Sequence, residues 1–239
     1  MPESNEGHRQ RLRDRFLEKG VDALTDSDIL ELLLTLGTPR RDCKKMARAA
    51  LEKFGSLQGV LDAPPDELTE IHGIGPINSF AVSFVQSVSR RYLKERIKER
   101  EYLHSSGAVA EYLVHSMRGL KKEILNVIFL DAAHGIIDSE IVAEGTLTTN
   151  TIYPRELVKK AIQHHAAAII IAHNHPSGSL SPSTDDIRLT RHLFMACSLV
   201  NINLLDHLIV GSGEKPYSFA DHGLMAEIRQ ECRKVAEHG

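Results

Sequence analysis

The chain has 239 residues, and its hydrophobic content of 42% and charged content of 26% are typical of a globular protein. It has no apolar run near the ~20 residues that span a membrane, and its first residues lack the charged-then-apolar pattern of a secretion signal, so we expect a cytoplasmic protein without membrane contact. The net charge of −3 excludes bulk attraction to nucleic acid, and three widely spaced cysteines exclude a disulfide framework and a four-cysteine zinc knuckle.

Basic side chains gather near the start of the chain. Four arginines at helical spacing lie within residues 8–15. Residues 1–100 nevertheless hold 17 basic and 16 acidic side chains, and residues 101–239 hold 12 and 16. Any affinity for DNA must therefore come from the local placement of charge. The arginine cluster fits phosphate contact and a solvated helix face equally well.

The first hundred residues have the pattern of successive helices. An apolar helix begins near Ser27, which suits an N-cap, and another ends at Gly55, which suits a left-handed C-cap. Pro64-Pro65 begins a short helix, and a long helix follows over about residues 76–96. We therefore expect residues 1–100 to form an all-helical domain.

An apolar-Gly-apolar-Gly turn lies between two of these helices, at Ile71-His72-Gly73-Ile74-Gly75. It resembles the hairpin of helix-hairpin-helix DNA-binding modules, in which glycines allow a tight turn and the next helix start meets a phosphate. Two interpretations remain open. The turn contacts DNA, or it is a plain helix–helix turn used for packing or for binding protein.

The second half alternates strands and helices after a charged linker. Residues 90–100 carry many charges of both signs, and Ser105-Ser106-Gly107 marks a boundary, so we divide the chain into domains 1–100 and 101–239. The alternation implies an α/β sandwich with a mixed sheet. We expect strands at 122–131, 136–144, 168–172, 202–210 and 217–219, helices at 107–117, 154–165, 183–199 and 225–237, and a loop or edge strand at 146–150.

A pattern typical of a metal site follows the most apolar strand. If the strand at 168–172 stays extended, His173 and His175 project from the same face. Ser183 suits the N-cap of the next helix, and Asp186 falls in its first turn, so two imidazoles and a carboxylate can meet at one point. Three protein ligands with one open position are typical of catalytic zinc. We therefore predict that His173, His175 and Asp186 bind Zn2+.

The spacing of these residues is similar to the JAMM motif of the MPN+ metallopeptidase-like fold, and the wider sequence resembles the bacterial RadC proteins. The resemblance extends over nearly the whole chain. It implies a JAMM/MPN-type (cytidine-deaminase-like) α/β sandwich with a mixed sheet behind a helix-hairpin-helix-like domain. The residues that support it are Tyr153-Pro154-Arg155-Glu156, His173-Asn174-His175-Pro176-Ser177-Gly178, Pro182-Ser183, Asp186, Leu205-Asp206-His207 and Gly145-Thr146-Leu147.

Zinc hydrolysis also needs a general base that takes a proton from water. The family places its catalytic glutamate at the start of the first sheet strand, and Glu123 matches that position. Glu140, Glu144 and Glu156 are alternatives with stronger structural explanations. Ser183 can cap its helix and, as the motif implies, donate to the oxyanion of the reaction. We therefore predict Glu123 and Ser183 as catalytic residues.

Polar side chains also occur at two further positions within or next to apolar strands. Asn174 stands between the metal histidines where the peptidase members commonly carry serine or threonine. Asp206-His207 lies in an apolar strand, and it is either a satisfied core pair or a support for a metal histidine.

Three classes of function are compatible with these features. The first is a zinc metallohydrolase, a peptidase or isopeptidase with a peptide or protein substrate, which the family name associates with DNA repair. The second is a DNA-binding or DNA-processing protein, in which residues 1–100 contact DNA and the zinc domain is structural or acts on nucleic acid. The third is a non-catalytic binding module whose metal serves stability. The sequence specifies neither the substrate nor the oligomeric state.

Overall fold

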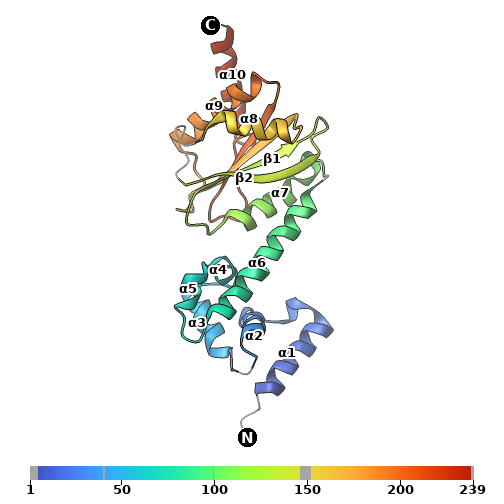
Figure 1. Ribbon diagram of the computed structural model, residues 1–239, viewed down its shortest axis with the longest axis vertical. Coiled ribbons are helices and arrows are strands. Elements are labelled where there is room, and N and C mark those ends of the chain that lie inside the picture. The colour runs from blue at the N-terminus through green and yellow to red at the C-terminus, as the bar shows by residue number, and fades with distance from the viewer. Residues whose placement is uncertain (1–4, 40, 99, 146–151, 238–239) are drawn as a thin grey trace. The chain divides into compact units, whose positions relative to one another are not determined.

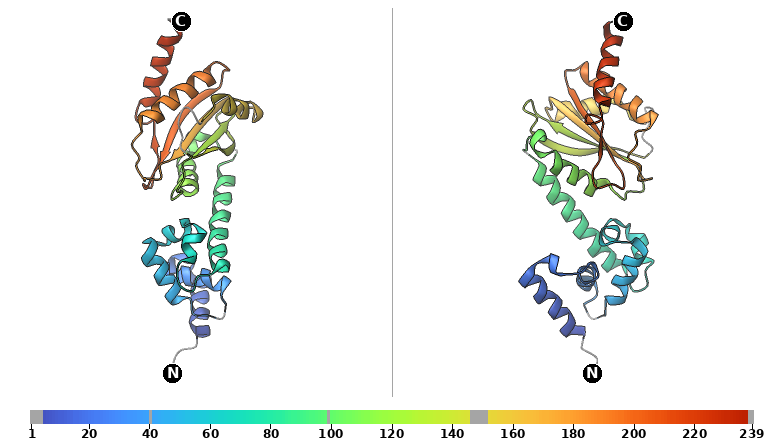
Figure 2. Two further views of the ribbon diagram at one scale, coloured as in Figure 1. Left: turned by 60° about the vertical axis from the view of Figure 1, so that its left-hand side comes forward. Right: turned by 180° about the vertical axis from the view of Figure 1, so that it is seen from behind.

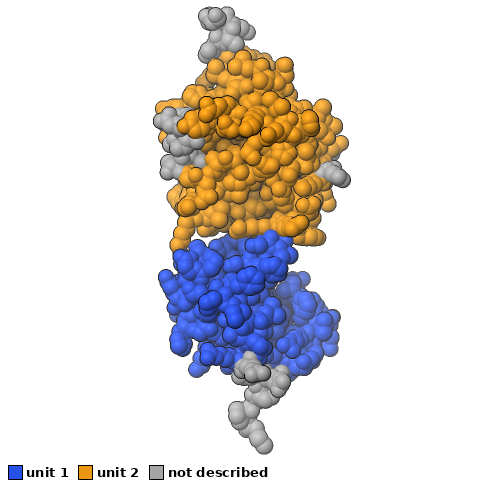
Figure 3. Space-filling model, viewed as in Figure 1, with its two compact units in different colours: residues 1–89 blue, residues 90–239 orange. Residues whose placement is uncertain are grey.

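The structure is a computed structural model, and it describes residues 5–39, 41–98, 100–145 and 152–237 (Figure 1). The chain divides into two compact units, residues 1–89 and 90–239, which Figure 3 colours separately. The predicted domain boundary after residue 100 stays a prediction. In the part of the chain that is described, no helix combines the length and the apolar character needed to cross a membrane.

The described elements of the first unit are all helices, as the sequence predicts. Their core is a cluster of buried aliphatic side chains that includes Leu30, Leu34, Ala47 and Leu68. The elements are α1 (Asn5–Lys19), the short 3-10 helix η1 (Val21–Ala23), α2 (Asp26–Gly37), α3 (Lys44–Phe54), α4 (Leu57–Asp62), α5 (Pro65–Thr69) and α6 (Pro76–Ile97), which ends in the second unit.

Helix caps set most of these boundaries. Thr25, rather than Ser27, is the N-cap of α2, because its hydroxyl accepts from the Asp28 amide and the Asp28 carboxylate accepts in return. Gly55 ends α3 in the left-handed conformation at φ 78°, as predicted. Helix α4 was not predicted from the sequence; it has six residues and follows the N-cap Ser56.

The glycine turn before α6 is tightly packed. Gly73 has φ 95°, and a Cβ there would lie 2.8 Å from the sulfur of Met46, so this position requires glycine. Ile71 and Ile74 on either side of it are buried. A Cβ at Gly75, by contrast, would meet nothing within 4 Å. The turn is therefore anchored at its first glycine and open at its second.

The second unit is an α/β sandwich with a five-stranded mixed sheet in the order β2-β1-β3-β4-β5. β3 is antiparallel to β1 and parallel to β4, and β2 and β5 pair antiparallel with β1 and β4. The elements are α7 (Tyr102–Met117), β1 (Ile124–Leu130), β2 (Ile136–Glu144), α8 (Pro154–Gln163), β3 (Ala168–Asn174), α9 (Thr184–Ser198), β4 (Asn203–Val210), β5 (Tyr217–Ser218) and α10 (Leu224–Glu237).

Helices cover both faces of this sheet (Figures 1 and 2). On one face, Ile169 and Ile171 of β3 pack in a core with side chains of α8, α9 and α10. On the other face, Ile170 packs in a second core with α7. β3 lies at the centre and every one of its residues is buried, which explains why the sequence shows a continuous apolar run there.

The predicted fold class is confirmed, with differences at the ends of elements. The helix predicted from Gly107 begins at Tyr102, and the strand predicted from Lys122 begins at Ile124. The stretch 146–150, predicted as a loop or an edge strand, lies outside the described residues.

Candidate metal centre

Two adjacent elements bring the predicted ligands together. His173 is the penultimate residue of β3, His175 follows its end, and Asp186 lies in the first turn of α9. Ser183 is the N-cap of α9. Its hydroxyl accepts from the Asp186 amide at 3.1 Å, and the Asp186 carboxylate accepts from the Ser183 amide at 2.7 Å. This capping box fixes the carboxylate on the side of the helix that faces the end of β3.

The ligand atoms converge on one point. Nε2 of His173 lies 2.9 Å from Nε2 of His175 and 3.1 Å from Oδ1 of Asp186, and Nε2 of His175 lies 3.3 Å from Oδ2 of Asp186. Nδ1 of His175 lies 3.0 Å from the carbonyl oxygen of Ser179 and donates a hydrogen bond to it. A neutral imidazole has one N–H, so Nε2 of a neutral His175 carries a lone pair. These are the donor atoms and the spacing that a divalent metal ion needs.

Asp186 is ionised at this site. The residue is only 5% exposed, and burial alone would raise its pKa. The neighbouring ring of His173 and the two hydrogen bonds with Ser183 outweigh burial and hold the pKa of Asp186 well below the usual range of a carboxyl. A buried anion beside two imidazoles favours a cation between them.

A second layer of polar groups lies behind His173. Its Nδ1 is 2.7 Å from Nε2 of His207 on β4, and Nδ1 of His207 is 2.6 Å from the hydroxyl of Thr190 on α9. Burial lowers the pKa of His207 well below the usual value. Of the two predicted roles for the Asp206-His207 pair, the geometry favours support of a metal histidine by His207.

Asp206 does not contact the ring of His207. Its carboxylate accepts from the hydroxyl of Ser218 at 2.6 Å and from the amides of Ala220 and His207 at 2.8 and 2.7 Å. Burial raises its pKa, and these hydrogen bonds act against the rise. Asp206 therefore serves to anchor the turn after β5.

Asn174 connects the metal strand to the segment before β1. Its Oδ1 accepts from the amide of Ile124 at 2.8 Å, and its Nδ2 donates to the carbonyl of Lys122 at 3.1 Å and to that of Leu120 at 3.4 Å. Glu123 lies inside the segment that these bonds hold. A serine or threonine could not reach three backbone groups in this way.

Glu123 lies directly before the strand that neighbours β3. Leu125, two residues later, pairs with His173 at the end of the antiparallel β1–β3 ladder. The amide of Ile124, between the two, bonds to the side chain of Asn174. The segment that contains Glu123 therefore adjoins the strand end that carries His173. Glu123 itself is half-buried.

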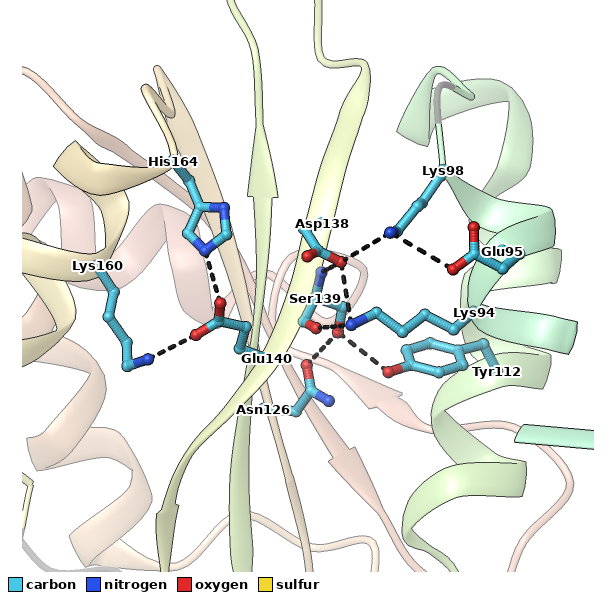
Figure 4. Close-up of polar contacts among 10 residues, drawn as sticks. All are labelled: Lys94, Glu95, Lys98, Tyr112, Asn126, Asp138, Ser139, Glu140, Lys160 and His164. Carbon is cyan, nitrogen blue, oxygen red and sulfur yellow. Dashed lines mark hydrogen bonds and ion pairs between the residues drawn. The ribbon is translucent and has the colours of Figure 1, made fainter. Parts of the chain in front are cut away.

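Glu140 belongs to a separate polar cluster on the edge strand β2. With Asp138 and His164 it forms the second group whose ligand atoms lie close together among the described residues. The bond from Lys160, ahead of the opposing effect of burial, keeps the pKa of Glu140 below its usual range. The two carboxylates already face the ammonium groups of Lys94, Lys98 and Lys160 (Figure 4).

The other two glutamates that we considered as bases also have basic partners. Glu144 lies 3.1 Å from Lys122, and Glu156 lies 3.3 Å from Arg155 in the first turn of α8. Both pairs are largely exposed. Their positions fit ordinary surface ion pairs.

The contact of Thr190 with His207 and the role of Asn174 were not predicted from the sequence. Thr190 lies four residues after Asp186, one helical turn further along the same face of α9, which is the pattern that could have drawn attention to it. Asn174 was noted as a departure from the family, but its three backbone partners are distant in sequence.

Two family models and several curated proteins match this chain. A family model described as RadC-like JAB domain matches residues 103–224, and one described as UPF0758 N-terminal matches residues 5–80. A UPF0758 protein of Burkholderia cenocepacia is 44% identical over 90% of this chain and 83% of its own length. UPF0758 proteins of Burkholderia mallei and Burkholderia ambifaria are 43% and 45% identical, each over 88% of this chain and over 76% and 82% of their own lengths.

Asp186→Asn tests the ligand assignment. The amide can still accept from the Ser183 amide and cap α9, but it lacks the charge that a cation needs, so we expect metal content to fall from about one zinc per chain to a small fraction of that. Elemental analysis of the purified protein measures this. Asp185→Asn is the matched control, since that carboxylate is 54% exposed and pairs with Arg188. A full equivalent of zinc in Asp186→Asn contradicts the assignment.

Proposed function

The chain belongs to the UPF0758 (RadC) family, and we propose that it is a zinc-dependent hydrolase that cleaves peptide or isopeptide bonds. The observation that supports this proposal is the convergence of His173, His175 and Asp186 at the end of a buried strand. The names of the relatives state no activity. Support for this activity therefore comes from the candidate metal site.

The donor set fits zinc. Two imidazole nitrogens and one carboxylate oxygen are a common three-ligand set of catalytic zinc sites and leave a position for a small molecule. When bound, the ion would supply Lewis acidity, which polarises a carbonyl and brings the pKa of a water molecule to about 7. His173, His175 and Asp186 would hold it, with His207 supporting His173.

Glu123 supplies the proton chemistry in this proposal. Its carboxylate takes a proton from the attacking water and passes it to the leaving amine, which must depart as a neutral group. Support for this role comes from the β1–β3 pairing, in which Leu125, two residues after Glu123, lies opposite His173. Asn174 keeps the backbone on both sides of Glu123 in place.

Ser183 can stabilise the oxyanion that forms on the substrate carbonyl. In the structure its hydroxyl oxygen accepts from the Asp186 amide. Accepting that bond leaves the hydroxyl proton for donation to a substrate oxygen. The cap and the proposed catalytic role are thus compatible.

The substrate is proposed as a peptide or a protein with an isopeptide link, and the oligomeric state is left open. A cytoplasmic location is part of the proposal, because Cys43, Cys197 and Cys232 are all free thiols and two of them are buried. Screening the zinc-loaded chain against peptides, isopeptide-linked proteins and nucleic acids identifies the substrate class. Turnover of nucleic acid alone would replace the peptidase proposal with the DNA-processing one.

Glu123→Gln separates chemistry from metal binding. We expect it to keep about one zinc per chain and to lose hydrolysis by roughly 10²–10⁴-fold, since the amide cannot accept the proton. Elemental analysis and turnover of the substrate found in the screen are the two measurements. Glu144→Gln is the control, because that residue is an exposed partner of Lys122. An active Glu123→Gln enzyme moves the role of base to Glu140, Glu144 or Glu156.

Asn174→Ser tests the placement of Glu123. Serine loses the bonds to the backbone of residues 120–124, so we expect zinc content to be unchanged while turnover falls by roughly 10²-fold, the cost of a displacement of about 1 Å. The buried backbone groups left unpaired lower the free energy of unfolding by about 1–3 kcal/mol, measured by urea denaturation. Asn203→Ser, at an exposed position on β4, is the control. Wild-type turnover in Asn174→Ser argues against a positioning role.

DNA contact through residues 1–100 is a second proposal, and the glycine turn is the observation that favours it. The first turn of α6 contains no acidic residue, and the approach to Gly75 is open. The arginine cluster contributes less than its spacing suggests. Arg9 is buried with its guanidinium donating to the carbonyl of Pro39, and Arg15 lies 3.7 Å from Asp28.

A salt titration of the full chain tests this second proposal. Fluorescence anisotropy with labelled single- and double-stranded DNA should show affinity that falls as salt rises. Gly75→Glu places a carboxylate at the turn, and we expect about tenfold weaker binding, since a hydrogen bond to a charged group contributes about 1.5–3 kcal/mol. Gly107→Glu is the control, because its Cβ also meets nothing within 4 Å. Binding without salt dependence, or equal affinities of the two variants, speaks against phosphate contact at this turn.

A further inference from the structure

We propose that Thr190, acting through His207, fixes the tautomer of His173 so that its Nε2 is held as a bare lone pair toward the metal position. Thr190 and His207 are then positioning residues rather than ligands. The role of the lone pair rests on the proposed zinc site. The arrangement of protons is independent of the zinc site, because it follows from hydrogen bonds within the chain.

The hydroxyl of Thr190 contacts a carbonyl oxygen of its own helix. Its Oγ1 lies 2.6 Å from the carbonyl oxygen of Asp186, one helical turn earlier in α9. A carbonyl oxygen can only accept, so the hydroxyl must donate its single proton there. Threonine commonly makes this bond within a helix. The same oxygen can then only accept in its second contact, at 2.6 Å from Nδ1 of His207.

The next proton therefore belongs to His207. Its Nδ1 must carry hydrogen in order to donate to Thr190. The ring has no exposed surface, and its two nitrogens face a hydroxyl and another imidazole, so it stays neutral and has one N–H. Its Nε2 is consequently an acceptor. Phe219 packs against the ring at 4.6 Å between centroids, which restricts rotation.

The last proton belongs to His173. Its Nδ1 lies 2.7 Å from the accepting Nε2 of His207, so it must donate. A neutral His173 ring then has no hydrogen on Nε2, the atom that lies 2.9 Å from Nε2 of His175 and 3.1 Å from Asp186. Thr190 is 0% exposed and His173 is 1% exposed. Water therefore has little access through which to rearrange these bonds.

This series of hydrogen bonds also connects two of the proposed ligands. It begins at the main-chain carbonyl of Asp186 and ends at the ring of His173. α9 therefore places the carboxylate through its N-cap and sets the tautomer of the histidine one turn later. The hydroxyl of Thr190 is the only member that a small substitution removes without changing the shape of the core.

The experiment combines nuclear magnetic resonance with metal affinity. Long-range proton–nitrogen spectra of the metal-free chain, labelled in histidine, report which ring nitrogens carry protons. We expect hydrogen on Nδ1 of both His173 and His207. A bare Nδ1 in either ring overturns the proposal. This measurement uses the wild-type chain, so it tests the predicted tautomers even if a variant does not fold.

Thr190→Val and Thr190→Ser provide the matched pair. Valine keeps the shape but leaves the buried Nδ1–H of His207 without an acceptor, so the ring takes the other tautomer and turns His173 Nδ1 into an acceptor. We expect zinc affinity, measured by competition with a chromophoric chelator, to fall about 10–100-fold in Thr190→Val, and Thr190→Ser to restore it. Equal affinities of the valine variant and the wild type, with unchanged histidine spectra, refute the proposal. The predicted tautomers in a chain that cleaves no substrate would refute only the hydrolase function.

Discussion

The second unit is organised around a concentration of electron-rich atoms at the end of β3. Two ring nitrogens and a carboxylate lie within 2.9–3.3 Å of one another, and His173 and Asp186 have almost no exposed surface. At this separation lone pairs repel each other unless a proton or a metal ion lies between them. Burial removes the water that would otherwise screen them. The surrounding structure has to hold these groups together against that repulsion.

The sheet provides this support from both neighbours of β3. His173 and Asn174 are consecutive and project to opposite faces. The first contacts His207 of β4, and the second contacts the backbone before β1. The end of the strand is therefore tied on both sides by side-chain bonds as well as by the ladder. A rigid strand end is what a ligand pair separated by one residue requires, since a frayed end would let His173 and His175 separate.

Local patterns were sufficient to predict the strand, the cap and the carboxylate. The apolar run of β3, the N-cap Ser183 and Asp186 three residues later depend on near neighbours in sequence, and the structure has each of them where it was expected. The supporting residues depend on tertiary packing. Thr190 meets His207 across 17 residues, and Asn174 meets Ile124 across 50.

In the first unit, a regular sequence pattern did not reveal the environment of each side chain. The arginines of residues 8–15 have helical spacing, and α1 is indeed a helix. Spacing cannot tell which of them faces the rest of the unit, and Arg9 is buried against the carbonyl of Pro39. Similarly, α4 was missed because it has only six residues, which is too short for an apolar period to appear.

The short distances between the proposed ligands link metal binding to the stability of the fold. The folded chain removes Asp186 from water, and its hydrogen bonds with Ser183 and the neighbouring His173 ring offset the cost of that burial. A cation at this point turns the mutual repulsion into attraction. Because the unfolded chain has no such arrangement, the free energy of binding adds to the stability of the second unit by linkage. The residues proposed to orient the ligands, Thr190 and His207, therefore affect metal affinity and stability together, whereas Glu123 lies outside the ligand set.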